Sequence, residues 1–545
     1  MSNLKIKKYR GKKPVVVAIL DGWGLGNDYN GNAITRAKTP TFDFLWKEYP
    51  HTELEASGKN VGLSPEQSGN SEAGHLNLGA GRIVDQDAVA ISRAISTGVF
   101  FKNLAFKNLL DHVQNTNGKI HLVGLLSGWQ SAHSDPDHIL ALLTLFRQKK
   151  IKNVYLHLFT DGRDSYQFGA LKFLEQIKKM TRNNEKVATV CGRYYAMDRM
   201  KKWNRTEKAY DLMTSGVGSC YADSAEAAIK NAYDRGETDE FVLPTTIVEG
   251  GKCDDKGICK GGKPIATIDS GDGVVFFNLR SDRARQFTKV FVQNDFEKRN
   301  KNSFKRKKIL KNISFVALTD FGPDLEKVMA AFPSRDVKNS LPKVLGENGV
   351  SQLYISETEK YAHVTYFFNG GFSDTIGGED RKIISSPDVA SYDTVPGMSS
   401  AKIVDFVVKD LKNKKHDFIL MNLASPDMIG HTGNLTAGIK ACEVVDKNLK
   451  KILTVIKKQK GVLIIVADHG NIEEMINKKT DEVNTQHTSN RVPFIVFDAN
   501  HKDSCVLEKR GVLGNVAPTI LDLMNIEKVK EMNLKTLIKN KKYGK

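Results

Sequence analysis

The stretch GVLIIVADHGN, residues 461–471, decides the fold, because a run of branched aliphatic residues ends directly in Asp468 and His469. Such a run is typical of a buried strand. Two further runs end in the same way: VVVAIL is followed by Asp21, and FILMNLAS leads to Asp427. Ligands bind beyond the carboxyl ends of strands in open parallel sheets, so these acidic residues are expected to converge on one site. A single Asp after a strand is more often a turn residue, and only the repetition favours a site.

The rest of the chain alternates short β-branched runs with longer amphipathic segments, which predicts an α/β fold. A helix is expected over about residues 437–458, where apolar residues recur every three or four positions and Gly461 lies just beyond. A second helix is expected over residues 224–235, with Gly236 as a left-handed stop. The expected strands are residues 14–20, 119–126, 153–159, 273–279, 416–423 and 461–467.

The length of 545 residues is too great for one compact core and predicts two or more domains. With 40% hydrophobic residues, the chain can bury large cores. Its longest apolar runs, such as residues 15–20 and 462–467, are too short to span a bilayer, and the basic N-terminus lacks the apolar stretch of a secretory signal. We therefore expect a cytoplasmic protein with no membrane partner.

The six cysteines do not make a disulfide framework in a chain of this size. Cys253 and Cys259 lie together in GGKCDDKGICKGGK, and the others are scattered. This pair could form half of a zinc site, but no second Cys/His pair follows at a suitable spacing. We expect a loop without metal in a chain whose cysteines are reduced.

The formal net charge of +18 at pH 7 is compatible with nucleic acid, a membrane surface or small anions as partners. The lysines are spread along the chain, with denser groups only at residues 298–308 and in the last residues. Neither group is interleaved with aromatic residues or placed in a nucleic-acid motif. The favoured interpretation is a lysine-rich solvated surface without a nucleic-acid partner, and the sequence assigns no role to residues 298–308.

Candidate metal ligands lie at or near the predicted strand ends, and none of them is a thiolate: Asp21, Asp427, His431, Asp468, His469 and His487. Asp427 and His431 are four residues apart, so one helical turn would aim both at the same point. Mixed carboxylate and imidazole sites suit manganese, zinc, magnesium or cobalt, and this set is enough for two ions. Two-metal sites typically clamp the attacking and leaving oxygens of a phosphoryl transfer. A lone histidine is more often a core or loop residue, but the Asp/His pairs favour metal binding.

A candidate nucleophile, Ser71, lies in the small, polar segment PEQSGNSEAGHLNLGAGRIV, residues 65–84. A serine hydroxyl needs a base or a metal to become an alkoxide, and the chain has no G-x-S-x-G elbow that would indicate a triad. Direct coordination to a metal would deprotonate it. The alternative is a helix N-cap serine, with Glu72 in the first turn. The two interpretations are compatible, because a helix N-terminus stabilises a phosphate.

Arginines gather in three compact polar motifs, which are TDGRDS at residues 160–165, GRYYAMDRMKKWNR at 192–205 and NLRSDRARQ at 278–286. Arginine binds carboxylate and phosphate bidentately, so an anionic small-molecule substrate would require several. Each arginine taken alone could equally form a surface ion pair of little energetic consequence. Two of the motifs follow predicted strands directly, which favours a substrate site.

Together these motifs resemble those of the cofactor-independent phosphoglycerate mutases. The motifs that carry the resemblance are, in order, GNSEAGHLNLGAGRIV, FTDGRDS, CGRYYAMDRMKKWNR, FFNLRSDRARQ, EKYAHVTYFFNGG, SPDMIGHTGN, VADHGN and VAPTILDL. They run from about residue 15 to about residue 525, so the match covers nearly the whole chain. The ordered group is far more specific than any single motif.

The resemblance implies an alkaline-phosphatase-like, metal-binding domain made of residues 1–86 and 325–545, with a substrate-binding α/β transferase domain inserted at residues 87–324. It implies interconversion of 3-phosphoglycerate and 2-phosphoglycerate through a phosphoserine, without bisphosphoglycerate. Two divalent ions are expected, with manganese favoured and cobalt, magnesium or zinc also compatible. A monomer is expected.

The resemblance also implies roles for individual residues. One metal would be held by Asp427, His431 and His487, and the other by Asp21, Ser71, Asp468 and His469. The substrate's phosphate and carboxylate would be bound by His133, Arg163, Asp164, Arg193, Arg199, Arg280, Arg283 and Lys360. Ser71 would receive the phosphoryl group, while Asp164 would transfer protons with help from Lys360.

Two segments depart from the family pattern. The family usually has S-D-G-G-V-H-S-H after one strand, whereas this chain has SGWQSAHSDPDHIL at residues 127–140. His133 can be aligned with the first histidine of that pattern, Asp135 replaces the second, and His138 is a rival candidate. In VPGMSS, Gly397 stands for the usual Glu, and nothing in the sequence explains the change.

Two other functions are compatible with parts of the sequence. A phosphatase or a phosphopentomutase-like relative would share the fold, although the arginine motifs argue against it. A lysine-rich nucleic-acid-binding protein would bind DNA or RNA in a salt-sensitive manner and would need no metal.

Overall fold

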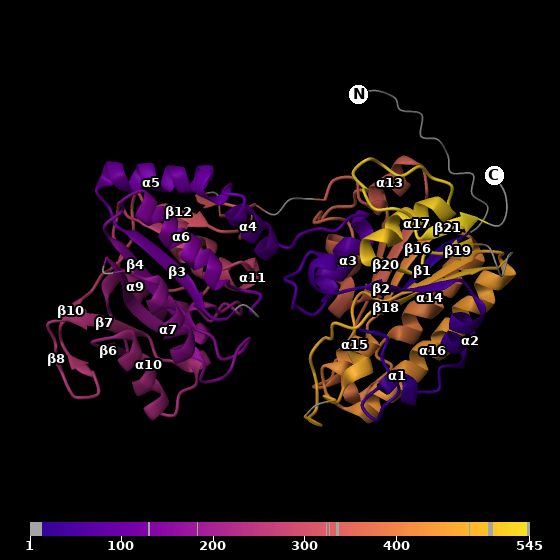
Figure 1. Ribbon diagram of the computed structural model, residues 1–545, viewed down its shortest axis with the longest axis horizontal. Helices are drawn as coiled ribbons and strands as arrows, with labels where there is room; N and C mark the ends of the chain where they lie inside the picture. Colours follow the sequence, from indigo (N-terminus) through magenta and orange to yellow (C-terminus); the bar gives the residue numbers. More distant parts are fainter. Residues whose placement is uncertain are drawn as a thin grey trace. The chain divides into compact units, whose positions relative to one another are not determined.

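The chain folds into two compact units in a computed structural model that describes residues 14–128, 131–182, 184–322, 324–325, 327–333, 337–478, 480–499 and 505–541 (Figure 1). The first unit consists of Met1–Gln86 and Arg335–Lys545, and the inserted unit of Asp87–Ser334. The chain returns to the first unit later than residue 324, where the sequence suggested the boundary. The reason is that strand β13 (Val328–Ala330) still pairs with β12 (Ser314–Ala317) in the sheet of the inserted unit.

The first unit is built on an eight-stranded sheet with the order β15-β14-β16-β1-β17-β18-β2-β20. Strands β15, β14, β16, β1 and β17 are parallel, β18 is antiparallel to its neighbours β17 and β2, and β20 is parallel to β2. Their bounds are β1 Val15–Leu20, β2 His51–Glu55, β14 Gln352–Glu357, β15 Asp380–Ile384, β16 Phe418–Leu423, β17 Val462–Val466, β18 Val492–Asp498 and β20 Arg510–Val512. β19 (Cys505–Leu507) and β21 (Ile538–Lys541) form a separate antiparallel pair.

Helices cover both faces of this sheet, and α14 and α16 run alongside one another (Figure 1). Helix α16 contacts both α2 and α14, and these three helices also contact strands of the sheet, while α3, α13 and α17 form a second contacting group. The α-helices are α1 Ala33–Arg36, α2 Pro40–Glu48, α3 Ser71–Ala80, α13 Leu341–Glu347, α14 Ser400–Asn413, α15 Ser425–Gly430, α16 Leu435–Lys458 and α17 Val516–Leu523. Short turns of 3₁₀ or π helix are η1 Gly58–Val61, η4 Thr358–Lys360, η5 His363–Phe367, η6 Tyr392–Thr394, η7 Ile472–Glu474 and η8 Leu513–Asn515.

The inserted unit has its own mainly parallel sheet, with the order β10-β7-β5-β4-β3-β11-β12-β13 and β6 paired to β7. The strands are β3 Ile120–Leu126, β4 Val154–Thr160, β5 Glu185–Gly192, β6 Cys220–Ala222, β7 Thr245–Glu249, β10 Lys263–Pro264, β11 Gly273–Phe276, β12 and β13. The helical segments are α4 Asp87–Ser96, η2 Phe100–Lys102, α5 Leu104–Thr116, α6 Pro136–Gln148, α7 Ala170–Met180, α8 Arg193–Ala196, α9 Trp203–Ser215, α10 Ala225–Asp234, η3 Asp239–Phe241, α11 Ser281–Val292 and α12 Phe296–Arg299. Separate apolar clusters fill the two sides of the sheet, one under α5, α6, α7 and α10 and the other under α9 and α11.

The predicted α/β class is confirmed, and each expected strand is present within one to three residues of its expected bounds. The long expected helix is α16, whose Asn434 side chain caps the N-terminus by accepting from the Ala437 amide at 3.1 Å. The second is α10, and Gly236 beyond it has the left-handed φ of 80° that a helix stop requires. Hydrophobic periodicity identified these elements because each buries one face of a helix or both faces of a parallel strand.

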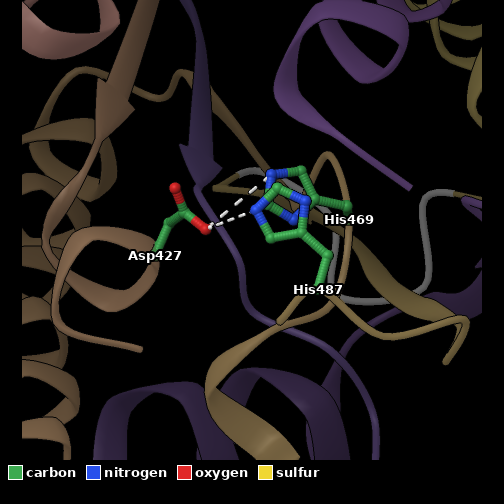
Figure 2. A group of neighbouring side chains, drawn as sticks. All are labelled: Asp427, His469 and His487. Carbon is green, nitrogen blue, oxygen red and sulfur yellow. Dashed lines mark ion pairs between the residues drawn. The ribbon is translucent and has the colours of Figure 1, made fainter. Parts of the chain in front are cut away.

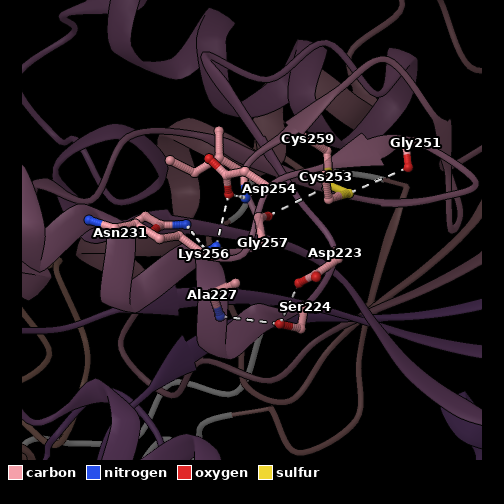
Figure 3. The surroundings of a disulfide bond; sticks show 11 residues. Asp223, Ser224, Ala227, Asn231, Gly251, Cys253, Asp254, Lys256, Gly257 and Cys259 are labelled. Atoms are coloured by element: carbon pink, nitrogen blue, oxygen red, sulfur yellow. Dashed lines mark hydrogen bonds between the residues drawn. A yellow bond between two sulfur atoms is a disulfide. The ribbon is translucent and has the colours of Figure 1, made fainter.

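The prediction that the cysteines are reduced is wrong for one pair, because Cys253 and Cys259 form a disulfide (Figure 3). They lie opposite each other in a hairpin of β8 (Lys252–Cys253) and β9 (Cys259–Lys260). The turn between them is closed by Asp254, whose carboxylate accepts from the Lys256 and Ile258 amides at 3.0 and 2.9 Å. Spacing alone did not reveal the pair, because the pairing depends on this local turn.

Among the described residues, no helix combines the length and the apolar character that crossing a bilayer requires.

Candidate metal centre

The candidate site of the first unit begins where three neighbouring parallel strands end. Leu20 of β1 is level with Leu423 of β16, and Ile19 is level with Val466 of β17. The chain therefore leaves all three strands at the same edge of the sheet. Asp21, Asp427 and Asp468, which follow these strands, are all buried there. This is the convergence that the three strand ends predicted.

Ser71 is the first residue of α3, and Asn70 is the cap. The Asn70 side chain accepts from the Ala73 amide at 2.9 Å, so the interpretation of Ser71 as an N-cap is wrong. Since Asn70 takes the capping role, the Ser71 hydroxyl is free to face the strand ends. Its Oγ lies 2.9 Å from His469 Nε2, 2.8 Å from Lys360 Nζ and 3.4 Å from Asp21 Oδ1.

Helix α15 presents Asp427 and His431 one turn apart, and the loop before β18 adds His487. His431 Nε2 lies 3.4 Å from Asp427 Oδ1, and His487 Nε2 lies 3.2 Å from the same oxygen. The Nε2 atoms of the two histidines are 3.0 Å apart. Figure 2 shows His469 and His487 directed at Asp427 from the same side, and the ligand atoms of these three residues lie within 4.8 Å of one another.

The hydrogen bonds of these histidines leave their facing nitrogens as electron-pair donors. His431 Nδ1 lies 2.8 Å from the Thr485 carbonyl oxygen, and His487 Nδ1 lies 2.8 Å from the Gly69 carbonyl oxygen. Because a carbonyl only accepts, each ring carries its proton on Nδ1, and each Nε2 presents a lone pair. Two lone pairs and a carboxylate oxygen aimed at one point repel each other unless a cation lies between them. These residues therefore fit a divalent metal ion.

A second group of possible ligands lies beside the first. His469 Nε2 is 3.4 Å from Asp468 Oδ2, 3.6 Å from Asp21 Oδ1 and 4.0 Å from Asp427 Oδ1. Asp468 Oδ2 is buried without a hydrogen-bond partner among the described residues. A buried, unsatisfied carboxylate oxygen is costly, and a metal ion would satisfy it. Asp21, Asp468 and His75 also form a group with ligand-like spacing.

Lys360 supplies positive charge to this acidic cluster. Its Nζ lies 2.6 Å from Asp21 Oδ1 and 2.6 Å from Asp427 Oδ2. Although burial opposes a charged lysine, these carboxylates raise the pKa of Lys360 above its ordinary value. Burial likewise opposes ionisation of Asp427, yet Lys360 holds the pKa of Asp427 well below its usual range. For Asp21, burial and the neighbouring Asp468 raise the pKa.

The other predicted site residues lie in the inserted unit, where they form a separate cluster of cations and acids. These residues are His133, Arg163, Asp164, Arg193, Arg199, Arg280 and Arg283. Arg199 donates to Asp282 Oδ2 at 2.7 Å, and Arg280 Nε lies 3.6 Å from Asp282 Oδ1. Burial, followed by the proximity of Arg199 and Arg193, lowers the pKa of Arg283. Like charges held this close together indicate a site for an anion.

Arg193 is the buried centre of this cluster. Its Nη1 lies 2.5 Å from Asp161 Oδ1 and 2.6 Å from Asp164 Oδ2. Burial opposes the ionisation of Asp164, but Arg193 holds the pKa of Asp164 below its ordinary value. Asp161 accepts further bonds from Ser127 Oγ at 2.6 Å and from the Asp164 amide at 3.0 Å, so it fixes both Arg193 and the loop after β4.

The structure separates the two histidines that competed for one predicted role. His133 Nε2 lies 3.6 Å from Asp164 Oδ2, and burial together with Arg193 lowers the pKa of His133 to about 4. His138 lies inside α6, where its Nε2 is 3.0 Å from Ser92 Oγ of α4. His133 is thus the histidine at the arginine cluster, and His138 belongs to the helix core.

Sequence reasoning missed several polar residues that hold the first-unit site. Asn422 Nδ2 donates to Asp21 Oδ2 at 2.6 Å, and Asn471 Nδ2 donates to Asp427 Oδ1 at 2.8 Å. His75 Nδ1 lies 3.3 Å from Asp468 Oδ2 and 2.9 Å from the Ser71 carbonyl oxygen. Asn422 could have been noticed as a polar residue inside the apolar run FILMNL, and Asn471 as part of the ADHGN stretch.

The comparisons with known proteins agree with this geometry. A family model described as the Metalloenzyme superfamily matches residues 13–528, so the chain belongs to that class of metal-dependent enzymes. The 2,3-bisphosphoglycerate-independent phosphoglycerate mutase of Clostridium kluyveri is 45% identical over 97% of this chain and 100% of that protein. An enzyme of the same description from Methanosarcina barkeri is 46% identical over 97% of this chain and 99% of its own length.

A solved structure gives the same result for the fold. The crystal structure of Leishmania mexicana phosphoglycerate mutase at low cobalt concentration superposes with a TM-score of 0.75 and 27% identity, covering 98% of this chain and 100% of that one. The chain is therefore a member of the 2,3-bisphosphoglycerate-independent phosphoglycerate mutase family, with its alkaline-phosphatase-like fold. It is an isomerase that interconverts 3-phosphoglycerate and 2-phosphoglycerate, small-molecule substrates of glycolysis, and it uses divalent metal ions.

Proposed function

We propose that the mutase reaction passes through a phosphoserine at Ser71. The observation that supports this most directly is the position of the Ser71 hydroxyl, within 3.4 Å of His469, Lys360 and Asp21. Its place at the N-terminus of α3 also favours a phosphoryl group, because the first amides of a helix and the helix dipole stabilise negative charge.

The first unit would hold two divalent ions. One would be bound by Asp427, His431 and His487, and the other by Asp21, Ser71, Asp468 and His469. When bound, the ions supply positive charge that lowers the pKa of the serine hydroxyl and neutralises the phosphoryl oxygens. Lys360 adds a fixed positive charge to the same cluster and orients the Ser71 hydroxyl through its 2.8 Å contact.

The inserted unit would bind the glycerate part of the substrate. Arg163, Arg193, Arg199, Arg280 and Arg283, with His133, would hold its anionic groups, with Lys360 of the first unit as a further ligand. Asp164 would move the proton of the substrate hydroxyl, because Arg193 keeps this carboxylate ionised and ready to accept. Both clusters are needed in one catalytic cycle: the arginines orient the glycerate, and Ser71 carries the phosphoryl group. The first unit thus acts as the phosphatase-like part and the inserted unit as the transferase part.

Manganese is the proposed metal. A mixture of buried carboxylates and imidazoles without a thiolate suits manganese and also accepts cobalt, magnesium or zinc. Cobalt is the ion named for the Leishmania mexicana enzyme. We further propose that the protein is cytoplasmic, since the glycolytic reaction of the family takes place on small soluble metabolites. We also propose that it is a monomer without a nucleic-acid partner.

The decisive experiment replaces the nucleophile. Ser71→Ala should reduce mutase activity in an enolase-coupled assay to background, while thermal unfolding stays close to that of the unmodified chain. Incubation with 3-phosphoglycerate should add a phosphoryl group to Ser71, detectable by peptide mass spectrometry. The matched control is Ser64→Ala in the preceding loop, which should keep full activity. Full turnover by Ser71→Ala would refute the assignment.

The same preparation distinguishes a mutase from a phosphatase. Release of free phosphate from 3-phosphoglycerate should be slow compared with formation of 2-phosphoglycerate, without added bisphosphoglycerate. Metal removal by a chelator should abolish both, and manganese should restore the mutase reaction.

A further inference from the structure

Glu473 is a buried carboxylate that none of the proposed steps uses, and it lies in η7 immediately after the Asp468–Asn471 turn. It has no exposed surface. Its oxygens accept hydrogen bonds from three separate segments of the chain. The residues that donate to it are Gly24, Asn471, Thr488 and Asn490.

Each of these donors belongs to a segment that also carries a proposed metal ligand. Gly24 N donates to Glu473 Oε2 at 3.0 Å and lies three residues after Asp21. Asn471 N donates to the same oxygen at 2.8 Å and lies two residues after His469. Ligands from different strand ends are therefore tied to a single carboxylate.

The other oxygen of Glu473 holds the third segment. Thr488 Oγ1 donates to Oε1, and Asn490 Nδ2 donates to it at 2.9 Å. Thr488 follows His487 directly, and its amide also pairs with the Gly470 carbonyl at 3.0 Å. The His487 loop has no regular secondary structure, and the two bonds to Glu473 Oε1 help to fix its position against the other two segments.

Two glycines, Gly24 and Gly470, leave the space that the Glu473 carboxylate occupies. A Cβ on Gly24 would lie 2.2 Å from Glu473 Cδ, and a Cβ on Gly470 would lie 2.5 Å from Glu473 Oε1. Any side chain at either position would displace the carboxylate. The close approach of Glu473 thus explains why Gly24 in DGWG and Gly470 in DHGN have no side chain.

We propose that Glu473 is a positioning residue for the metal centre, which sets the spacing of the Asp21, His469 and His487 segments before metal binds. This inference rests on the proposed metal ligands. Its physical basis is that a carboxylate accepting several N–H and O–H bonds makes charge-assisted, directional contacts and so holds the attached loops rigidly. Outer residues of this kind typically change metal affinity by about 10- to 100-fold when they are replaced.

The test is Glu473→Gln, which keeps the size of the side chain but replaces one acceptor with a donor. The amide can still accept from Gly24 and Asn471, but its NH₂ group faces the amide donor of Asn490. The His487 loop should therefore loosen first. We expect the manganese concentration for half-maximal binding, measured by electron paramagnetic resonance of free Mn²⁺, to rise about 10- to 100-fold. The absorption spectrum of the cobalt-loaded protein should change as well.

Glu474→Gln is the matched control, since it makes the same chemical change at the adjacent residue, whose carboxylate pairs with Lys478 at 3.1 Å on the surface. It should bind manganese as the unmodified chain does. If Glu473→Gln fails to fold, Thr488→Val provides the test, because it removes only the hydroxyl link to the His487 loop. Thr488→Val should weaken manganese binding in the same direction.

Two outcomes are distinguishable. If Asp427→Asn lowers the number of bound manganese ions from two to one while Glu473→Gln and Thr488→Val leave the manganese titration and the cobalt spectrum unchanged, the positioning role is refuted and the metal assignment stands. If Asp427→Asn also leaves manganese binding unchanged, the proposed metal site itself is wrong.

Discussion

At the scale of single residues, Lys360 is expected to stabilise the proposed metal site in the metal-free protein. Two buried carboxylates, Asp21 and Asp427, each lie 2.6 Å from its ammonium group. Removing one partner of a buried ion pair leaves uncompensated charge, which typically costs about 3–5 kcal/mol. In the metal-free protein the Lys360 ammonium thus partly neutralises the charges of Asp21 and Asp427.

We predict that Lys360→Met lowers the free energy of unfolding of the metal-free protein by about 3 kcal/mol. Saturating manganese should reduce this loss, because the ions neutralise the same carboxylates. Urea unfolding of both variants with manganese and with a chelator measures the difference. Lys343→Met is the control: Lys343 pairs with Glu347 at 3.8 Å on the surface, and its loss should change stability by less than about 0.5 kcal/mol. An equal loss for Lys360→Met with and without metal would contradict the argument.

Residues of the candidate site could be predicted from the sequence where they follow buried strands. The convergence of Asp21, Asp427 and Asp468 could be predicted in this way, because neighbouring strands of a parallel sheet end at one edge. Asn422 and Asn471 were not predicted, because no sequence pattern marks an amide that donates a hydrogen bond to a distant carboxylate. His133 could be separated from His138 only by the structure, since the altered segment at residues 127–140 leaves the alignment open and only the fold shows that His138 lies in α6.

At the scale of elements, α3 carries Ser71 to the strand ends because a glycine lets it approach them closely. A Cβ on Gly74 would lie 2.6 Å from the Asp468 carbonyl oxygen and 2.8 Å from the Asp468 Cβ. Alanine normally stabilises a helix interior by about 1 kcal/mol relative to glycine. Here the contact with Asp468 reverses that preference, because the helix would have to move away from β17.

We predict that Gly74→Ala lowers kcat at least 10-fold, because shifting the serine by a fraction of an ångström misaligns it for phosphoryl transfer. Steady-state kinetics at saturating manganese, together with thermal unfolding, separate this effect from instability. Leu76→Ala, on the half-exposed side of the same helix, is the control that should lower stability and leave kcat nearly unchanged. A Gly74→Ala enzyme with normal kcat would show that α3 can shift without consequence.

The fold was predictable at this scale for a related reason. Parallel strands that are buried on both faces have continuous apolar sequences, and α16 has apolar residues at every third or fourth position over its length. Both kinds of element can therefore be recognised in the sequence. The hairpin of β8 and β9 could not be recognised in the sequence, because its strands are two residues long and depend on a turn around Asp254. Short elements that local hydrogen bonds stabilise leave no hydrophobic period to detect.

At the scale of the whole molecule, the inserted unit contains buried histidines that bear on its stability in acid. The inserted unit buries His121 and His157 on adjacent strands, with His121 Nδ1 and His157 Nε2 2.9 Å apart. Asp272 Oδ2 lies 3.1 Å from His121 Nε2, and Thr189 Oγ1 lies 2.9 Å from His157 Nδ1. One proton fills the gap between the two rings, so one ring donates it and the other accepts it with a lone pair, and at least one of the two imidazoles must be neutral.

Burial sets the direction of the pH dependence. It lowers the pKa of His121 and, well below the ordinary value of 6.5, that of His157. For His138, burial in α6 lowers the pKa to about 4. A histidine whose folded-state pKa is lowered binds fewer protons in the folded than in the unfolded state. The stability that it contributes is therefore complete above pH 6.5 and is lost as the pH falls towards the folded-state value.

We predict that the inserted unit loses stability between pH 6.5 and 4, with His138 alone accounting for about 3 kcal/mol. Amide hydrogen exchange followed by mass spectrometry reads each unit separately, and peptides of β3, β4 and α6 should lose protection over this range. His138→Gln removes one titrating group. The unfolding free energy obtained from the exchange rates should therefore fall less steeply with decreasing pH, by at most the contribution of one bound proton. The metal-free first unit contains its own histidines, so only peptides from the inserted unit bear on the prediction. Protection in β3 and β4 that stays constant from pH 7 to pH 4 would show that these buried imidazoles remain neutral at no cost, contrary to the linkage argument.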